Sequence, residues 1–216
     1  MAAVRGREDR ARRAVVAVCR RLAERGLVAG MDGNVSVRLD ARRILCTPSG
    51  ASTGELRPAD LVVVDAAGTP RRGERGVPSS ELDLHLRAYA RRPEVRAVVH
   101  GHPPVATGWA VAGRDFMAPV LPEVILLMGR VPLVPFAVPG TPAVADAFEP
   151  FFPHHDVFLM AHHGALALGS TLTRAHQRME SLEHAARILE TAARLGPVHA
   201  LPADVVARLV ARRVST

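Results

Sequence analysis

The sequence predicts an α/β domain in which helices cover a mixed, largely antiparallel sheet, and three observations lead to this prediction. Short apolar segments with the alternation of β-strands occur between amphipathic segments with helical spacing. Several strand-like segments are separated only by short turns, which favours hairpins over the crossovers of a regular doubly wound fold. No internal repeat or low-complexity linker interrupts the 216 residues, so we expect one domain over 1–216.

The first part of the chain predicts a helix followed by strands. Residues 9–28 carry apolar side chains at helical spacing and end near two glycines, which predicts a helix. Residues 34–39 and 42–47 alternate with period two around a short polar turn, which predicts a hairpin. Residues 60–65 are a short run of branched apolar side chains and indicate a buried strand.

The middle of the chain alternates between helices and strands. A loop over 67–78 leads to a predicted helix over 79–92. The helix should end there because a proline follows. Residues 94–100 predict a strand, and 103–113 predict a helix with prolines in its first turn. Residues 121–129 are ambiguous and are interpreted as a short helix.

The last part predicts the remaining strands and helices. Residues 131–137 form a strand that contains prolines, so this strand should lie at an edge of the sheet or at an irregular place. Residues 156–170 predict a strand, a turn and a second strand. Three further helices are expected over 141–152, 171–196 and 203–213.

Composition argues against several classes of protein. Hydrophobic residues make up 48% of the chain, which is ample for a core, and no apolar run reaches the roughly 18 residues that cross a bilayer. The formal net charge is +7, from 28 basic and 21 acidic residues. The arginines are scattered, however, and a single Trp and a single Tyr are too few to stack on successive bases. We therefore expect neither a nucleic-acid nor a membrane partner.

The N-terminal segment and the two cysteines indicate a cytoplasmic protein. The basic N-terminal segment is not followed by the apolar segment and cleavage site of a secretory signal. Cys19 and Cys46 are too few for a disulfide framework, and each lies within a predicted helix or strand. We interpret both as reduced packing residues.

Histidines follow two apolar strands at the point where each strand ends. In VVHGHPP, His100 and His102 are two residues apart and therefore share a face of an extended chain. In FLMAHHG, His162 and His163 follow a second strand. Three imidazoles with a free fourth position form a common catalytic zinc site. The alternative is that each histidine is an ordinary polar residue at a strand end.

A carboxylate occurs at the predicted start of the helix over 79–92. Ser80 and Asp83 match a capping box, and Glu81 in the first turn suits the helix dipole, so a structural role explains the segment. Free N–H groups and two serine hydroxyls at a helix N-terminus also bind anions. A carboxylate beside a metal can serve as a general acid or base.

Two further turns, MDGNVS and TPSG, contain glycines, hydroxyls and an amide. Such turns can place backbone N–H groups around a phosphate. The same sequences also occur in ordinary turns, so each motif alone is a weak indication.

The order of the motifs resembles the class II aldolase/adducin family. From about residue 10 to about residue 195 the chain contains, in the family's order, GNVSVR, TPSG, DLVVVD, PSSE, HLRAY, RP, VVHGH, PFAVPGT and HHG. The resemblance is greatest to the branch that cleaves fuculose phosphate. It implies a three-layer α/β/α fold and a homotetramer with four-fold symmetry, whose active sites lie between neighbouring subunits.

The resemblance also implies the roles of individual residues. The metal ligands would be His100, His102 and His163, because the family's third ligand directly precedes a glycine. The metal would be zinc, or manganese or cobalt in its place. Glu81 matches the catalytic carboxylate. The positions that bind the substrate phosphate in the family correspond here to Asn34, Ser49, Gly50, Ser79 and Ser80.

The chain departs from the family's pattern at two places. Met31 stands where the aldolases have a threonine near the phosphate, and Leu121 stands where a neighbouring subunit supplies a tyrosine. Glu123 lies close to that second position, and a carboxylate at about this place is catalytic in related dehydratases. Glu123 either replaces the tyrosine as a catalytic group or caps a short helix after Pro122.

These residues predict a metal-dependent aldolase. The expected reaction cleaves a phosphorylated ketose, of the fuculose 1-phosphate or 5-deoxypentulose 1-phosphate type, to dihydroxyacetone phosphate and an aldehyde through an enediolate. Dehydration, 4-epimerisation and decarboxylation use the same three-histidine metal and remain alternatives. A non-catalytic scaffold, like the adducin head, is the alternative from another class. The six remaining histidines, including His85 one turn after Glu81, are expected to be packed or solvated.

Overall fold

A seven-stranded sheet forms the centre of the molecule in the computed structural model, which describes residues 2–115 and 119–214. The strands are β1 (Asn34–Arg38), β2 (Ile44–Cys46), β3 (Val62–Val64), β4 (Ala97–Gly101), β5 (Leu133–Val134), β6 (Val157–Met160) and β7 (Gly164–Gly169). Their order is β3-β2-β1-β4-β7-β6-β5. Every described neighbouring pair is antiparallel except β5 and β6, so the mixed, largely antiparallel sheet is confirmed.

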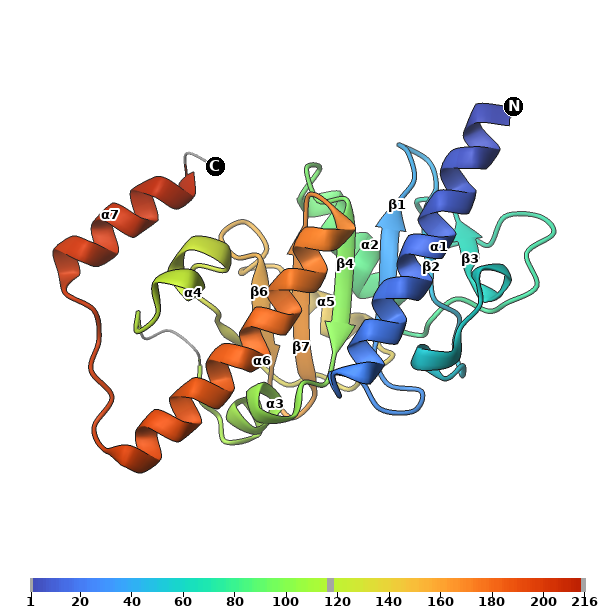
Figure 1. Cartoon of the computed structure of the whole chain (residues 1–216). Coiled ribbons are helices and arrows are strands. Elements are labelled where there is room, and N and C mark those ends of the chain that lie inside the picture. The colour runs from blue at the N-terminus through green and yellow to red at the C-terminus, as the bar shows by residue number, and fades with distance from the viewer. Residues whose placement is uncertain (1, 116–118, 215–216) are drawn as a thin grey trace.

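Helices cover both faces of this sheet (Figure 1). The helices are α1 (Ala2–Glu24), α2 (Leu82–Arg91), α3 (Pro104–Val111), α4 (Pro122–Leu127), α5 (Pro142–Phe148), α6 (Leu172–Leu195) and α7 (Ala203–Val214). Short 3-10 turns lie at Thr53–Glu55 and Pro58–Asp60. None of the described helices is both long and apolar enough to span a bilayer.

The core divides into two layers because side chains alternate along each strand. Val99 of β4 packs in the layer that includes α1, α3, α4 and α6, whereas Val98 packs in the layer that includes α2 and α5. The next residue on the α2 side of β4 is His100, which is buried at the strand's end. The alternation therefore delivers this imidazole toward the start of α2.

Several helix boundaries differ from the prediction, and the end of α1 and the start of α2 have local causes. Helix α1 ends at Glu24 because Gly26 takes a left-handed conformation (φ 66°) and the N–H groups of Gly26 and Leu27 bond back to Ala23 and Leu22, which is a Schellman cap. Helix α2 begins only at Leu82, after the two serines of PSSE. The predicted helix starts, residues 9 and 79, were respectively too late and too early.

The predicted capping box of α2 was wrong. The N-cap residue is Glu81, and no side chain caps the helix there. Ser79 instead donates its backbone N–H to Thr47 (3.2 Å), and Pro78 pairs with Pro48 as an isolated bridge. This pairing keeps Pro78 and Ser79 outside the helix, and Ser80 and Glu81 form a turn in which the N–H of Leu82 bonds to the carbonyl oxygen of Ser79 (3.1 Å).

The strands near the C-terminal end agree with the predictions. Strand β5 is short and lies at the edge of the sheet, as expected for a segment with prolines. Strands β6 and β7 form the expected pair around the turn that contains His163. Cys19 and Cys46 are free and buried, as expected of packing residues.

One carboxylate joins three helices. Asp156, just before β6, accepts hydrogen bonds from Arg92 after α2 (2.9 Å), Arg178 of α6 (2.7 Å) and Arg213 of α7 (2.6 Å). Arg213 also donates to the carbonyl oxygen of Met128 (3.1 Å). These charge-assisted bonds attach the C-terminal helix to the sheet.

Candidate active site

His100 ends strand β4 with a defined orientation. Its Nδ1 donates to the carbonyl oxygen of Ala165 on β7 (2.9 Å), because a carbonyl can only accept. When the ring is neutral, its lone pair is therefore on Nε2; when the ring is protonated, Nε2 donates to Oε2 of Glu81 (3.1 Å). This Nε2 lies 3.2 Å from Nε2 of His102 and faces the start of α2.

His102 is placed by the turn that follows β4. Its backbone N–H bonds to the carbonyl oxygen of Leu27 (2.8 Å), and a Cβ on the preceding Gly101 would lie 2.9 Å from the same oxygen. Only glycine allows this close approach of the two backbones. These two contacts therefore fix the direction in which the backbone leaves the sheet at His102.

His163 comes from the turn between β6 and β7. His162 has a left-handed backbone (φ 54°), a conformation that is uncommon outside glycine, and it turns the chain so that His163 faces the other two rings. A Cβ at Gly164 would lie 2.5 Å from the carbonyl oxygen of Gly101. The glycine after His163 is thus required for β7 to approach β4 at this point.

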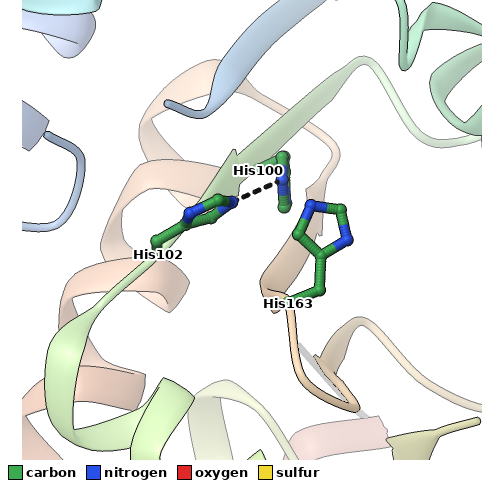
Figure 2. Close-up of side chains that lie close together, drawn as sticks. All are labelled: His100, His102 and His163. Carbon is green, nitrogen blue, oxygen red and sulfur yellow. Dashed lines mark hydrogen bonds between the residues drawn. The ribbon is translucent and has the colours of Figure 1, made fainter. Parts of the chain in front are cut away.

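The three imidazoles converge, as Figure 2 shows. Their ring centroids are 4.9–5.2 Å apart, and one nitrogen from each ring lies within 4.8 Å of the others. Ligands of a tetrahedral zinc ion lie roughly 3.3 Å apart, given the usual Zn–N length, which is close to the separation of the Nε2 atoms of His100 and His102 (3.2 Å). The donor set therefore fits a divalent metal with an open position.

Glu81 lies against this cluster. Its Oε2 accepts from Nδ2 of Asn34 (2.9 Å) and lies 3.1 Å from Nε2 of His100. Its Oε1 lies 3.2 Å from Nε2 of His163, without the geometry of a hydrogen bond. The position at the N-terminus of α2, next to Asn34 at the start of β1, brings the carboxylate to the histidines.

The electrostatics keep Glu81 ionised. Burial raises the pKa of Glu81, but the hydrogen bond and charge of His100, with smaller contributions from His163 and Asn34, lower it well below its usual range. Burial lowers the pKa of His100, yet the contact with Glu81 outweighs it and the pKa is raised. Burial and the charge of His100 lower the pKa of His163 to about 4. A neutral His163 at pH 7 is ready to bind a metal.

Four of the five predicted phosphate-binding residues lie in two loops that touch, whereas Asn34 lies in β1. Ser49 donates its backbone N–H to Val77 (2.8 Å), and Ser79 donates to Thr47 (3.2 Å). These two N–H groups are therefore used between the loops. The Oγ of Ser79 accepts from the N–H of Glu81 (3.3 Å), which leaves its hydroxyl proton for another acceptor. Gly50 has a left-handed backbone (φ 71°). Ser80 lines a cavity of about 140 Å³ together with Glu81 and Thr141.

Asn34 has a contact that the sequence did not predict. It was expected at the phosphate, yet its amide nitrogen donates to Glu81 and its Oδ1 is buried without a hydrogen-bond partner among the described residues. In this arrangement Asn34 orients the carboxylate. A role at the phosphate stays a prediction.

Glu123 is not part of the cluster within one chain. It is exposed in the first turn of α4, where Leu121 is the N-cap residue and no side chain caps the helix. Helix α4 packs against α6 and α7, and no hydrogen bond or ion pair of the described residues joins Glu123 to the histidines. A catalytic role for Glu123 would have to come from a neighbouring subunit and stays a prediction.

Asp32 was not among the predicted site residues, although it lies beside His102. Its Oδ2 lies 3.5 Å from Nδ1 of His102, on the side of the ring away from His100. The residue belongs to the MDGNVS turn, which attracted notice for its glycines and amide. A signal was available, because a metal-binding histidine usually has an acceptor for its second ring nitrogen.

The remaining histidines have the expected surroundings. His85 is buried and its Nδ1 is hydrogen-bonded with Oγ of Ser36 (2.8 Å), while His154, His184 and His199 are exposed. His176 is buried on α6 beside Glu180, and His155 bonds to the carbonyl oxygen of Arg130.

The chain is similar to known proteins over most of its length. The model of the class II aldolase and adducin N-terminal domain family matches residues 13–189. The 3-oxo-tetronate 4-phosphate decarboxylase of Haemophilus influenzae is 34% identical over 172 residues, which cover 78% of this chain and 81% of the relative. The L-fuculose phosphate aldolase of Methanococcus vannielii is 34% identical over 173 residues, 80% of this chain and 92% of the relative.

Two further similarities extend over most of the chain. The 5-deoxy-D-ribulose 1-phosphate aldolase of Bacillus thuringiensis is 32% identical over 201 residues, 92% of each protein. Among solved structures, a protein from Escherichia coli whose name leaves aldolase, epimerase and decarboxylase open has a TM-score of 0.87 and 31% identity. The superposition covers 94% of this chain and 99% of that chain.

Proposed function

Since this chain belongs to the class II aldolase and adducin N-terminal domain family, we propose that it is a metal-dependent carbon–carbon lyase that cleaves a phosphorylated ketose. The substrate is of the fuculose 1-phosphate or 5-deoxypentulose 1-phosphate type, and the products are dihydroxyacetone phosphate and an aldehyde. The observation that carries the proposal is the contact of Glu81 with two of three converging imidazoles.

The metal would be held by His100, His102 and His163, with zinc as the expected ion and manganese or cobalt as alternatives. When bound, it supplies a Lewis acid that stabilises the negative charge developing on the substrate's oxygens. All 28 basic residues of the sequence are arginines, so no lysine ε-amine of this chain could form an imine with the ketose. This composition supports a metal as the electrophile.

Glu81 is proposed to move the proton at the substrate carbon that becomes nucleophilic. The lowered pKa of Glu81 keeps it a carboxylate, and Asn34 fixes one of its oxygens. The second oxygen, Oε1, has no hydrogen-bond donor among the described residues. It can therefore take up the proton that the substrate hydroxyl loses on cleavage, directly or by way of water, and deliver that proton to the enediolate carbon. The hydroxyls of Ser49, Ser79 and Ser80 are proposed to hold the phosphate on the adjoining loops.

Decarboxylation is a second candidate, because the decarboxylase of Haemophilus influenzae is a relative at 34% identity. In aldol cleavage a substrate hydroxyl must lose its proton as the carbon–carbon bond breaks. In decarboxylation the carboxylate leaves as carbon dioxide, and no proton has to be removed from the departing group. The apolar Leu121, at the position of the family's tyrosine, therefore suits decarboxylation as well as release of an apolar aldehyde.

The assembly belongs to the same proposal. A homotetramer with sites between neighbouring subunits would bring the exposed Glu123 of one subunit toward the histidines of the next. A carboxylate at that position would also suit dehydration, in which the carbon skeleton is retained. The mass of the purified protein by light scattering tests the assembly.

The deciding experiment combines a substrate panel with one variant. Ketose 1-phosphates and a 3-oxo acid 4-phosphate are tested with zinc, manganese and cobalt, and released aldehyde and carbon dioxide are measured separately. Glu81→Gln keeps an acceptor for Asn34 but removes the base, so kcat should fall by about 10²–10⁴-fold. Glu190→Gln, at a partly exposed position of α6, serves as the control. Unchanged turnover in Glu81→Gln would remove Glu81 from its role, and a wild-type protein without bound metal would favour a scaffold.

A further inference from the structure

The second ring nitrogens of His100 and His102 have different partners. Nδ1 of His100 donates to a backbone carbonyl, whereas Nδ1 of His102 faces the carboxylate of Asp32, with 3.5 Å between Nδ1 and Oδ2. The separation is longer than a strong hydrogen bond, and the side chain of Asp32 is about half exposed (49%), so a small rotation can shorten it.

We propose that Asp32 is a positioning residue that holds His102 in its metal-binding tautomer. A carboxylate only accepts, so the proton of the neutral ring is held on Nδ1 and the lone pair on Nε2. That Nε2 is the atom that faces Nε2 of His100. The inference rests on the proposed metal site and adds a residue to which the family resemblance assigned no role.

The backbone around Asp32 is fixed, although its side chain is not packed. The N–H of Asp32 bonds to Ala29 (2.9 Å), and its carbonyl oxygen accepts from Oγ1 of the buried Thr53 (2.8 Å). The following Gly33 is left-handed (φ 71°), and a Cβ there would lie 2.8 Å from the carbonyl oxygen of His100. The turn is therefore anchored on β4 next to the two histidines.

The charge of Asp32 has a second effect. A carboxylate that accepts from the distal nitrogen of an imidazole makes the other nitrogen a better donor to a metal. Together with Glu81, Asp32 places two negative charges around three neutral imidazoles, which balances the charge of a divalent cation. A neutral acceptor such as an amide would orient the ring without this charge.

The test uses Asp32→Asn and Asp32→Ala. Because the side chain is half exposed, both variants should fold with the wild-type unfolding midpoint when no metal is present. Zinc affinity, measured by competition with a chromophoric chelator, should fall by about 10–100-fold in Asp32→Ala and by less in Asp32→Asn, which retains an acceptor. Asp204→Asn on α7 removes an equally charged, exposed carboxylate and should bind zinc like the wild type.

A second readout does not depend on metal. In metal-free protein at pH 8, ¹⁵N spectra of the imidazoles should show His102 as the Nδ1–H tautomer in the wild type and a mixture of tautomers in Asp32→Ala. If Asp32→Ala binds zinc with the wild-type affinity and its His102 keeps the Nδ1–H tautomer, the proposal is overturned. A wild-type protein that binds no zinc, with His102 still in the Nδ1–H tautomer, would instead contradict the proposed function and leave the orienting contact intact.

Discussion

At the scale of single residues, His85 packs beneath the candidate site, between α2 and β1. The residue lies one turn after Glu81 on α2 and is fully buried, with Nδ1 in a hydrogen bond with Ser36 of β1. The same Ser36 hydroxyl also bonds with the hydroxyl of Tyr89 (2.8 Å). Burial, followed by the charge of His100, lowers the pKa of His85 to about 3.

This lowered pKa predicts a loss of stability in mild acid. Above pH 6.5, His85 is neutral in both the folded and the unfolded chain, so it causes no pH dependence. Below that pH the unfolded chain binds a proton that the folded protein does not bind. The free energy of unfolding should therefore fall as the pH decreases from 6.5 toward 3, by up to about 1.4 kcal/mol per pH unit from this residue.

Urea titrations of His85→Asn between pH 7.5 and 4.5 measure this contribution. The variant should be less stable at pH 7.5, because it leaves a small cavity, but its stability should decrease less steeply with acid. His184→Gln, at an exposed position, should retain the wild-type slope. Equal slopes in the wild type and His85→Asn would show that His85 is protonated in the folded state.

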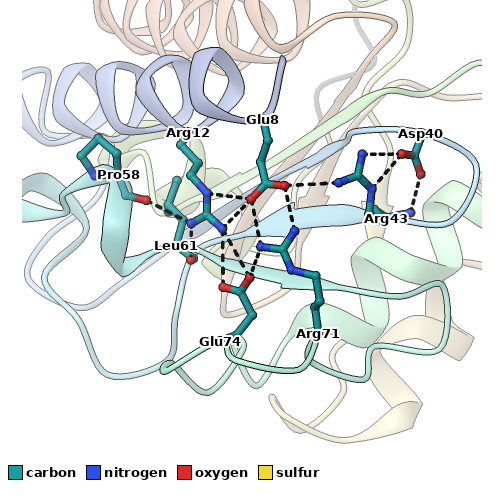
Figure 3. Close-up of polar contacts among 8 residues, drawn as sticks. All are labelled: Glu8, Arg12, Asp40, Arg43, Pro58, Leu61, Arg71 and Glu74. Atoms are coloured by element: carbon teal, nitrogen blue, oxygen red, sulfur yellow. Dashed lines mark hydrogen bonds and ion pairs between the residues drawn. The ribbon is translucent and has the colours of Figure 1, made fainter. Parts of the chain in front are cut away.

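At the scale of elements, a cluster of charges attaches α1 to the rest of the molecule (Figure 3). Glu8 of α1 contacts Arg12 (2.9 Å), Arg71 (2.9 Å) and Arg43 (3.2 Å), and Arg71 also pairs with Glu74 (2.6 Å). Burial raises the pKa of Glu8, but the hydrogen bonds of Arg71 and Arg12 outweigh it and lower the pKa. One carboxylate thus joins the helix to the loop after β3 and to Arg43, just before β2.

Removing this carboxylate should weaken the attachment of α1. Glu8→Gln leaves three guanidinium groups without their shared partner, so the free energy of unfolding at pH 7 should fall by about 1–2 kcal/mol. Because the folded pKa is lowered, the stabilisation is present above the unfolded pKa of glutamate and is lost as the pH falls through the folded value. The wild type and Glu8→Gln should therefore become similar in acid.

Chemical denaturation with hydrogen exchange measures both effects. Faster exchange should be confined to α1 and the loop after β3. Glu190→Gln, which removes an exposed i,i+4 pair with Arg194, should change stability by about 0.5 kcal/mol or less. A loss in Glu8→Gln no larger than in this control would mean that the cluster is fully screened by solvent.

At the scale of the whole molecule, the metal-binding residues join distant parts of the chain. His100 lies in β4 and His102 directly follows it, whereas His163 precedes β7, and the pairing of these two strands brings the residues together. An unfolded chain does not hold the three rings at one point. A metal bound to them therefore stabilises the folded state selectively.

Zinc should accordingly raise the unfolding temperature of the metal-free protein. At a free zinc concentration 100 times the Kd, the added stability is about 2.7 kcal/mol, and a chelator should reverse it. His163→Ala should abolish most of the shift in unfolding temperature, because only the imidazoles of His100 and His102 remain as ligands. The same shift in His163→Ala and the wild type would place the metal elsewhere.

The sequence by itself determined the elements and the candidate ligands. Period-two alternation predicted the strands, and the spacing of His100 and His102 placed both on one face. The order of the motifs predicted the family, which the comparisons show. These features are local or depend on motif order, so they can be read along the chain.

Only the tertiary structure decided which groups meet. Pro78 and Ser79 stay outside α2 because they pair with the loop after β2, and no local pattern indicates that pairing. Asn34 contacts Glu81, and Asp32 faces His102, because β1 lies beside β4. Such contacts join residues that are far apart in the sequence. Their geometry depends on how closely two backbone segments approach each other at glycines, and neither composition nor residue spacing predicts that distance.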